Sequence, residues 1–339
     1  NVVRWEMRTR LFLRTTEFLW QEGHTVHKDE KDADDRARMM LEVYRDFSEN
    51  YMAIPVILGQ KTESEKFAGA LKTYSCEAMM QDGKALQFAT SHNLGDHFAK
   101  AFGIKYLDEN NELKFGWQTS WGLSTRSIGG LIMTHSDDKG LVLPPKMAQT
   151  AVVIIPILLG KEGDEKIIEE SQKIKKTIEG LGYGCKVDQR DLRPGEKFYE
   201  WERKGVPIRI EIGPKDLLAE KIVVVRRDIG EKFDVLINKI SEEIPTLLNT
   251  IQSDLFNRAL EFQKQKTKVV DSWDDFAKEI EAGNFVLAHW DGSSETESKI
   301  KEETGATIRC IPFNREEETG ICIKTGNPSE GRVIFAKAY

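Results

Sequence analysis

The chain has 339 residues and a formal net charge of −7 at pH 7, which suggests two or three domains and argues against indiscriminate binding to nucleic acid. Charged residues make up 31% and aromatic residues 9% of the chain, as in folded rather than disordered proteins. No stretch approaches the ~20 apolar residues of a membrane helix, and the first residues do not form a signal-peptide pattern. The four cysteines (76, 185, 310 and 322) form no disulfide framework at this length. These features predict a reducing, cytoplasmic compartment and no membrane partner.

Two apolar segments joined by the charged turn MRTR begin the chain. Their residues favour strands at 2–5 and 11–13. An antiparallel pair would place Arg4, Glu6 and Arg14 on neighbouring positions. Guanidinium groups suit phosphate because they offer a planar, two-pronged set of donors, and a carboxylate beside them can accept from an amine or a ribose. The pattern predicts either a polyanion site or a surface hairpin with ordinary ion pairs.

The next two segments are expected to provide the framework of a domain. Residues 31–52 have helical periodicity, and residues 53–59 follow as a strand. Residues 84–102 then lead into a helix expected to begin near Leu94, with Ser91 or Asn93 as its cap.

Residues 117–148 hold a further group of candidate site residues. Trp121 and Arg126 precede a glycine pair, Gly129 and Gly130, in an apolar helical run. A glycine pair lets backbones approach closely, here a helix against a strand or against a ligand.

A second domain begins near residue 149. An unbroken β-branched run predicts a buried strand, and it is followed by an amphipathic helix at 164–181 and further strands. This alternation predicts an α/β domain with a mixed sheet. Residues 186–232 hold twelve Lys or Arg against ten Asp or Glu, a local charge of +2 in a chain whose remainder is −9. Helices at 251–265 and 272–283 and a strand at 284–290 then predict a third, small α/β module.

Several of these segments resemble prolyl-tRNA synthetases. The words RWE, FLRT and EFLWQEGH in residues 1–24 are similar to motif 2 of a class II aminoacyl-tRNA synthetase, and STRSIGGLIMTHSDDKGLVLPP is similar to motif 3. The resemblance implies a partial antiparallel-sheet catalytic domain (1–148), an α/β anticodon-binding domain (149–250) and a C-terminal zinc-binding-like domain (251–339). It also implies that the chain begins at motif 2, with motif 1 and the dimer surface upstream. Only about seventy residues separate His24 from the TSH segment, which leaves no room for an inserted editing domain and favours the eukaryotic/archaeal type.

The resemblance assigns roles to individual residues. Arg4 and Arg126 would be catalytic, because they would stabilise charge on the phosphates while magnesium bridges them. The ATP-binding set would be Arg4, Glu6, Arg14, Thr15, Gln87, Ser124 and Arg126. The proline-binding set would be Arg4, Trp20, Glu22, His24, Thr90, His92 and Trp121.

The resemblance also predicts a tRNA-reading segment. The words KFYEWERKGVPIRIEIGPKD are similar to the anticodon-binding domain of the family. Glu202, Arg209, Lys215 and Lys232 would then read the guanines of the proline anticodon, because Arg and Lys donate to guanine acceptors and Glu accepts from guanine amines.

The C-terminal module departs from the family's metal pattern. Many members carry a four-cysteine zinc site, whereas this chain offers only Cys310 and Cys322. The neighbouring acids, 316–318, are poor ligands for a soft site, so we expect no metal there. The final Tyr339 resembles a terminal tyrosine whose carboxylate approaches the catalytic domain.

The predicted function is therefore ATP-dependent activation of proline to prolyl-adenylate, followed by transfer to its tRNA, by a homodimer. An alternative is a synthetase-like protein that binds tRNA or a regulatory partner without catalysis; such a protein usually lacks the motif arginines, which are present here as Arg4, Arg14 and Arg126. Another amino acid in the pocket, cysteine or alanine, is also left open.

Overall fold

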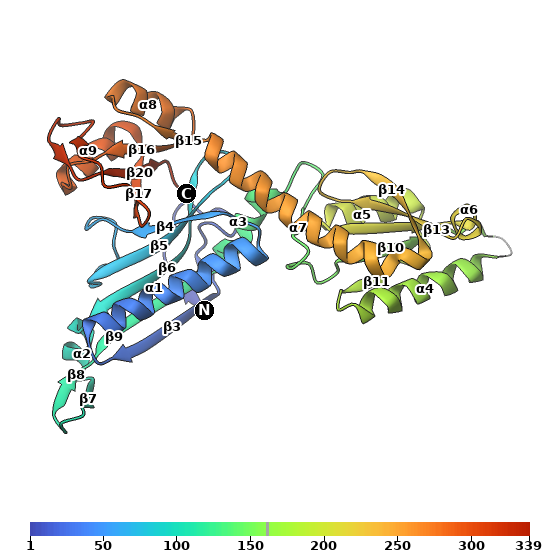
Figure 1. Cartoon of the computed structure of the whole chain (residues 1–339), viewed down its shortest axis with the longest axis horizontal. Helices are drawn as coiled ribbons and strands as arrows, with labels where there is room; N and C mark the ends of the chain where they lie inside the picture. Colours follow the sequence, from blue (N-terminus) through green and yellow to red (C-terminus); the bar gives the residue numbers. More distant parts are fainter. Residues whose placement is uncertain (161–162) are drawn as a thin grey trace. The chain divides into compact units, whose positions relative to one another are not determined.

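The computed structural model describes residues 1–160 and 163–339, and the chain separates into two compact units. Unit 1 comprises residues 1–50, 54–134 and 260–339, and unit 2 comprises residues 51–53 and 135–259. The long helix α7 (Ile240–Gln265) contributes residues to both units (Figure 1). The ranges 1–148, 149–250 and 251–339 stay a prediction for domain boundaries, but most of the first and most of the last lie in unit 1.

A nine-stranded sheet unites unit 1, with the strand order β15-β16-β20-β17-β4-β5-β6-β9-β3. Its strands in chain order are β3 (Trp20–His27), β4 (Val56–Gln60), β5 (Lys72–Met79), β6 (Ala85–Gly95), β9 (Trp117–Ser124), β15 (Thr267–Val269), β16 (Phe285–His289), β17 (Thr307–Pro312) and β20 (Arg332–Ala336). The C-terminal strands join the N-terminal ones where β17 pairs with β4, with Ile311 opposite Gln60. Gly59 permits this approach, because a Cβ there would lie 2.5 Å from the Ile311 carbonyl oxygen.

Helix α1 (Glu30–Asp46) packs on the N-terminal strands of this sheet, mainly β5, β6 and β9. Its N-terminus is capped by the Asp29 carboxylate, which accepts from the Asp32 N–H at 2.8 Å. Ala33, Ala37 and Leu41 are fully buried beneath it, as helical periodicity predicts. The predicted helix 31–52 therefore exists, and its last turn is the π-helix η1 (Phe47–Tyr51).

The remaining elements of unit 1 are short. Its helices are α2 (His97–Phe102), α3 (Arg126–His135), whose last residue belongs to unit 2, α8 (Trp273–Glu281) and α9 (Ser294–Thr304). Three two-stranded ladders pair β1 (Val2–Val3) with β2 (Glu17–Phe18), β7 (Lys105–Leu107) with β8 (Leu113–Phe115), and β18 (Gly320–Ile321) with β19 (Pro328–Ser329).

The strand predicted at residues 11–13 is wrong. The partner of β1 is β2, and residues 11–13 form a turn closed by a bridge between Arg10 and Arg14. Phe12 has a φ of 60°, which no strand permits. Leu13 is buried and contacts the Gly129 backbone of α3, so tertiary packing prevails over the strand propensity of the leucines.

One further local prediction, the helix after β6, needs correction. The helix expected near Leu94 begins at His97, because β6 continues through Gly95, and neither Ser91 nor Asn93 caps it. Both residues lie within β6, where backbone hydrogen bonds belong to the sheet. After residue 290 an acid- and serine-rich run forms α9, and Ser293 caps it by accepting from the Glu295 N–H at 3.2 Å.

Unit 2 confirms the predicted α/β domain with a mixed sheet. Its strand order is β11-β10-β12-β13-β14, parallel around β10 and antiparallel beyond β12. The strands are β10 (Val152–Pro156), β11 (Cys185–Val187), β12 (Ile208–Ile212), β13 (Lys221–Arg226) and β14 (Lys232–Leu236). The helices are α4 (Asp164–Gly180), α5 (Pro194–Arg203), α6 (Pro214–Leu218), the 3₁₀ turn η2 (Ile237–Lys239) and α7.

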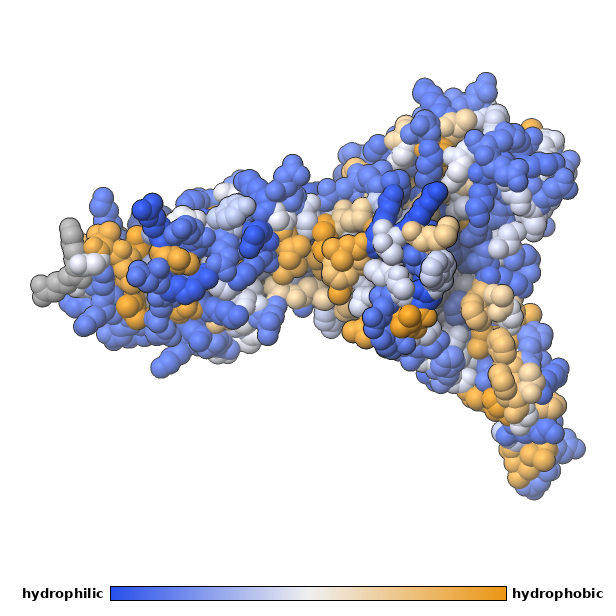
Figure 2. Space-filling model, turned by 180° about the vertical axis from the view of Figure 1, so that it is seen from behind, coloured by the Kyte–Doolittle hydropathy of each residue, from blue (hydrophilic) through white to orange (hydrophobic). Residues whose placement is uncertain are grey.

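The surface is mostly hydrophilic on the face that Figure 2 presents, with hydrophobic patches on both units. Across residues 1–160 and 163–339, no helix combines the length and the apolar character needed to cross a membrane.

Candidate active site

Unit 1 contains a pocket of about 430 Å³ in which most of the predicted ligand-binding residues meet. It is built by β3, β5, β6 and β9 together with the first residue of α3 and the N-terminal loop. The predicted residues that line it are Arg4, Trp20, Glu22, Gln87, Thr90, His92, Trp121, Ser124 and Arg126. Residues separated by more than a hundred positions are thus brought to one cavity by strand pairing.

One end of the pocket is strongly cationic. Arg126 opens α3, and its Nε donates to the Leu13 carbonyl at 3.1 Å. Burial, together with the charges of Arg4 and Arg14, lowers the pKa of Arg126. Mutual repulsion among these guanidinium groups means that an anion bound between them would be strongly stabilised.

The other predicted nucleotide residues of the N-terminal segment do not line the pocket. Glu6 links two of the arginines, accepting from Arg14 Nε at 3.2 Å and lying 3.7 Å from Arg4. The backbone N–H of Arg8 lowers the pKa of Glu6 against the effect of burial, and Arg14 and Arg4 lower it further. Thr15 lies in the same loop, outside the pocket lining. The predicted grouping of Arg4, Glu6 and Arg14 therefore forms, through a loop rather than a strand pair.

His92, which also lines the pocket, sits between two threonines. Its Nδ1 lies 2.9 Å from the Thr73 hydroxyl, and its Nε2 lies 3.1 Å from the Thr90 hydroxyl. Burial lowers the pKa of His92 to about 4, so the imidazole is neutral near pH 7. The Phe67 ring lies against it at a centroid distance of 5.2 Å.

The pairing of β3 with β9 places the predicted aromatic residues. Trp121 is opposite Gly23, and a Cβ at Gly23 would lie 2.3 Å from the indole, so the ring covers this glycine. Trp20 and Glu22 of β3 line the pocket, whereas His24 does not; its Nε2 lies 3.2 Å from the Glu22 carboxylate.

Several lining residues were not predicted, among them Glu65, Phe67, Thr73 and Ser120. Thr73 could have been found from the register of β5 and β6, in which it is opposite His92. Glu65 and Phe67 lie in a charged loop that carries no local signal for a ligand.

Unit 2 gathers three of the four predicted anticodon residues around a small cavity of about 110 Å³. Glu202, Arg209 and Lys232 line it, and Lys215, in α6, does not. Arg209 donates to Glu211 at 2.9 and 3.1 Å and lies over the Phe198 ring at 4.4 Å. Lys232 contacts the same carboxylate at 3.1 Å. A ligand that reads these cations must therefore compete with Glu211.

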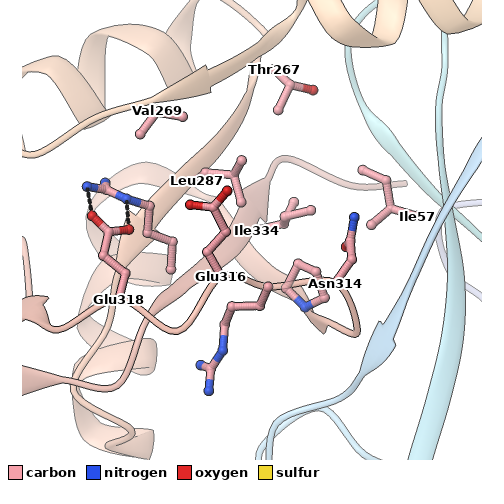
Figure 3. A pocket seen from close by; sticks show the side chains of 11 residues that line it. Ile57, Thr267, Val269, Leu287, Asn314, Glu316, Glu318 and Ile334 are labelled. Carbon is pink, nitrogen blue, oxygen red and sulfur yellow. Dashed lines mark hydrogen bonds and ion pairs between the residues drawn. The ribbon is translucent and has the colours of Figure 1, made fainter.

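A larger cavity, of about 520 Å³, lies in the C-terminal part of unit 1 and contains none of the predicted residues. Figure 3 shows Glu316 directed into it beside Leu287 and Ile334. Arg332 and Glu318 also line this cavity, and the Arg332 guanidinium donates to the Glu318 carboxylate oxygens at 3.0 and 3.2 Å.

The residues that the structure describes form no cluster of three or more His, Cys, Asp or Glu suited to a metal ion. Cys310 and Cys322 are both buried, and burial raises the pKa of the Cys310 thiol to about 12, with Glu77 acting in the same direction. A protonated thiol is a poor zinc ligand.

The chain's last residue packs against the nine-stranded sheet of unit 1. The Tyr339 N–H donates to the Ala85 carbonyl at 3.3 Å, its hydroxyl donates to Asp82, and the Arg10 guanidinium lies 5.6 Å from its ring.

Comparison with known proteins agrees with this geometry. Residues 1–135 match the family model "tRNA synthetase class II core domain (G, H, P, S and T)", residues 151–247 match "Anticodon binding domain", and residues 273–339 match "Prolyl-tRNA synthetase, C-terminal". The antiparallel sheet and its pocket are thus those of a class II aminoacyl-tRNA synthetase.

Similarity to curated relatives shows which kind of class II synthetase this is. The whole chain is 54% identical over 348 residues to a proline--tRNA ligase of Chloroherpeton thalassium, covering 72% of that protein. It is 54% identical over 340 residues to one of Porphyromonas gingivalis and 53% identical over 341 residues to one of Christiangramia forsetii, covering 69% of each. The chain belongs to the prolyl-tRNA synthetase family.

Proposed function

We propose that this protein activates L-proline with ATP to form enzyme-bound prolyl-adenylate and pyrophosphate, and then transfers the prolyl group to the tRNA for proline. The observation that carries the proposal is the unit 1 pocket, where Arg4 and Arg126 line the same cavity as His92 and Trp121. A polyphosphate fits the first set of residues and a small amino acid fits the second.

The arrangement assigns chemical roles to the side chains. The proline carboxylate attacks the α-phosphorus of ATP, pyrophosphate leaves, and Arg4 and Arg126 stabilise the negative charge that develops on the phosphate oxygens. No side chain forms a covalent intermediate. The Leu13 carbonyl orients Arg126 through its Nε hydrogen bond, which leaves the terminal guanidinium nitrogens for the ligand.

The amino-acid end of the pocket selects by shape and charge. A neutral His92, held by Thr73 and Thr90, does not repel the prolyl ammonium, and Glu22 offers it a carboxylate. Trp20 and Trp121 supply apolar surface for the ring methylenes. Gln87 and Ser124 provide neutral polar contacts for the nucleotide.

Unit 2 supplies the tRNA-reading surface of the proposal. Arg209 and Lys232 would release the Glu211 carboxylate and donate instead to guanine acceptors. Glu202 would accept a hydrogen bond from a guanine amine. Lys215, outside the cavity, would contact the nucleic acid from α6.

ATP with Mg²⁺ is the proposed cofactor set, and the C-terminal module is proposed to bind no zinc. Structural zinc requires four ligands, and Cys310 and Cys322 are the only cysteines near the family's zinc positions. Elemental analysis after dialysis should show well under one zinc per chain. A stoichiometric zinc content that is lost together with the fold on chelation would contradict this.

We further propose a cytoplasmic homodimer. The alternative, a synthetase-like protein without catalysis, is disfavoured because Arg4, Arg14 and Arg126 are all present and two of them line one pocket.

Proline-dependent ATP–pyrophosphate exchange by the full-length protein tests the function directly. We expect exchange that depends on proline and is weaker with cysteine or alanine. Binding of tRNA without exchange for any amino acid would instead establish the non-catalytic alternative.

A further inference from the structure

A tight turn that follows α3 lies against the end of helix α5 in unit 2. Asp137 and Gly140 close the turn with two backbone hydrogen bonds, at 3.1 and 3.2 Å, and Lys139 lies between them in the chain. The turn packs against Arg203, the last residue of α5: a Cβ at Gly140 would lie 2.6 Å from the Arg203 backbone, and the Leu141 N–H donates to the Arg203 carbonyl at 3.0 Å. The backbone of the turn is therefore fixed to the end of α5.

This arrangement places Lys139 beside Glu202, the residue of α5 that precedes its last one. Both line the unit 2 cavity. Lys139 Nζ lies 3.6 Å from the Glu202 carboxylate, which is longer than a hydrogen bond, and the two side chains are 68% and 30% exposed. In the part of the chain that the structure describes, neither charged group has a closer partner. Both groups can therefore turn toward a ligand while they stay next to each other.

The other cations of the cavity are held by carboxylates within hydrogen-bond distance. They are Arg209, Arg226, Arg227 and Lys232. Arg227 shows this most clearly, because it donates to both oxygens of Asp137, at 2.6 and 2.9 Å, and its side chain is only 5% exposed. Among the described lining residues, Lys139 is therefore the cation that a ligand can reach without breaking a hydrogen bond.

Lys139 and Glu202 offer a donor and an acceptor side by side, which matches one edge of guanine. An ammonium group only donates and an ionised carboxylate only accepts. On its base-pairing edge, guanine carries the acceptor O6 next to the donors N1–H and N2–H, and bases in single-stranded loops expose this edge. Adenine carries a donor, N6–H, next to an acceptor, N1. In the same orientation, adenine would therefore set donor against donor and acceptor against acceptor.

We propose that Lys139 helps to select guanine in the anticodon: its ammonium group donates to O6 of a guanine whose N1–H and amino group donate to Glu202. This inference rests on the proposed function, in which Glu202 reads guanine. It adds to the reading surface a residue of the turn after α3. The predicted range 1–148 assigned this turn to the catalytic domain, whereas the structure places it in unit 2.

Aminoacylation of tRNA transcripts by the full-length protein tests the proposal. Each anticodon guanine is replaced in turn by adenine, and kcat/KM is compared with that of the unchanged transcript. Lys139→Met removes the donor, and at one position it should reduce the preference for guanine over adenine about tenfold, since a good paired contact to a base supplies about this much discrimination. Lys139→Arg keeps a donor and should stay within about threefold of the wild type. Proline-dependent exchange should be unchanged in both variants.

Lys204→Met is the matched control. Lys204 lies two residues after Glu202 and carries the same charge at the same end of α5, but its Nζ pairs with Glu200 at 2.6 Å and it does not line the cavity. This variant should leave the preference for guanine over adenine unchanged at every position.

Binding of a labelled anticodon stem-loop RNA, followed by fluorescence anisotropy, provides a second readout that does not depend on catalysis. A loss in Lys139→Met that is equal for guanine and adenine would mean a contact to phosphate and would overturn the base-reading role. An unchanged preference for guanine in that variant would overturn it as well. Absence of exchange and aminoacylation in the wild type would overturn the proposed function instead, while the stem-loop would still show whether Lys139 selects guanine.

Discussion

At the scale of single residues, the surroundings of the pocket determine which side chains are charged and which are neutral. Arg126 is half-buried and lies within electrostatic reach of Arg4 and Arg14, so its charge is poorly solvated until an anion binds. His92 is half-buried, and its pKa, lowered to about 4, keeps the imidazole neutral near pH 7. The same cavity thus offers guanidinium groups together with a neutral imidazole and aromatic rings, as a substrate pair of polyphosphate and amino acid requires.

Arg126→Ala should lower the rate of adenylate formation at least ~100-fold, because a preorganised charged donor is commonly worth a few kcal/mol in the transition state. The measurement is proline-dependent pyrophosphate exchange in full-length protein whose circular dichroism spectrum is unchanged. Near-wild-type exchange in that variant would exclude the assigned role.

His135 should make stability depend on pH. Its Nε2 donates to the Met52 carbonyl at 2.9 Å, and burial lowers its pKa to about 4. In the unfolded chain the pKa of His135 is near its ordinary value of 6.5. Between about pH 4 and 6.5 the unfolded chain therefore binds more protons than the folded one, so the free energy of unfolding rises with pH over this range and is lost as pH falls from about 6.5 toward 4.

Urea denaturation between pH 4.5 and 7 measures this effect. The wild type should lose up to about 1.4 kcal/mol per pH unit from His135, and His135→Gln, which keeps an amide donor, should remove that part of the slope. If the free energy of unfolding changes with pH by the same amount in the wild type and in His135→Gln, the pKa of His135 is the same in the folded and the unfolded state.

At the scale of elements, strand pairing sets the position of the pocket side chains. The register of β3 and β9 places the Trp121 indole over Gly23, and the register of β5 and β6 places Thr73 beside His92. The position of a side chain in the pocket wall therefore depends on the neighbouring strand as much as on the strand that carries it.

Gly23→Ala should raise the KM for proline about tenfold, because the new methyl would lie 2.3 Å from the Trp121 ring and force it to move. Steady-state exchange kinetics at varied proline concentrations test this. Gly180→Ala is the control, since a Cβ there meets nothing within 4 Å. An unchanged KM for proline would mean that Trp121 does not shape the amino-acid site.

At the scale of the whole molecule, two compact units divide the proposed work. Unit 1 holds the pocket and the C-terminal strands in one sheet, and unit 2 holds the cations proposed to read the anticodon. Activation of proline and recognition of tRNA are therefore expected to respond to different substitutions.

Arg209→Ala should raise the KM for tRNA in aminoacylation while proline-dependent exchange stays intact, because Arg209 lies in unit 2 and lines its cavity. Loss of both activities to the same degree would point to a folding defect or to a misplaced reading surface.

Much of the site was predictable from the sequence because its residues lie in short motifs. Arg4, Gln87, His92, Trp121 and Arg126 were identified in this way, and the pocket contains them all. The mixed sheet of unit 2 was also predictable, since β10 is an unbroken β-branched run, α4 is periodic, and further strands alternate with helices. Local sequence determines such features because side-chain periodicity is itself a local property.

Other features were decided only by the tertiary structure. Residues 11–13 carry strand-forming side chains but form a turn, because Leu13 packs on α3. The antiparallel pairing of β17 with β4 and the contact between Glu77 and Arg309, which lie 232 positions apart, follow no motif. Such pairings depend on which apolar faces the folded chain can bury together and on where buried charges find partners, and those conditions exist only once the whole sheet has formed.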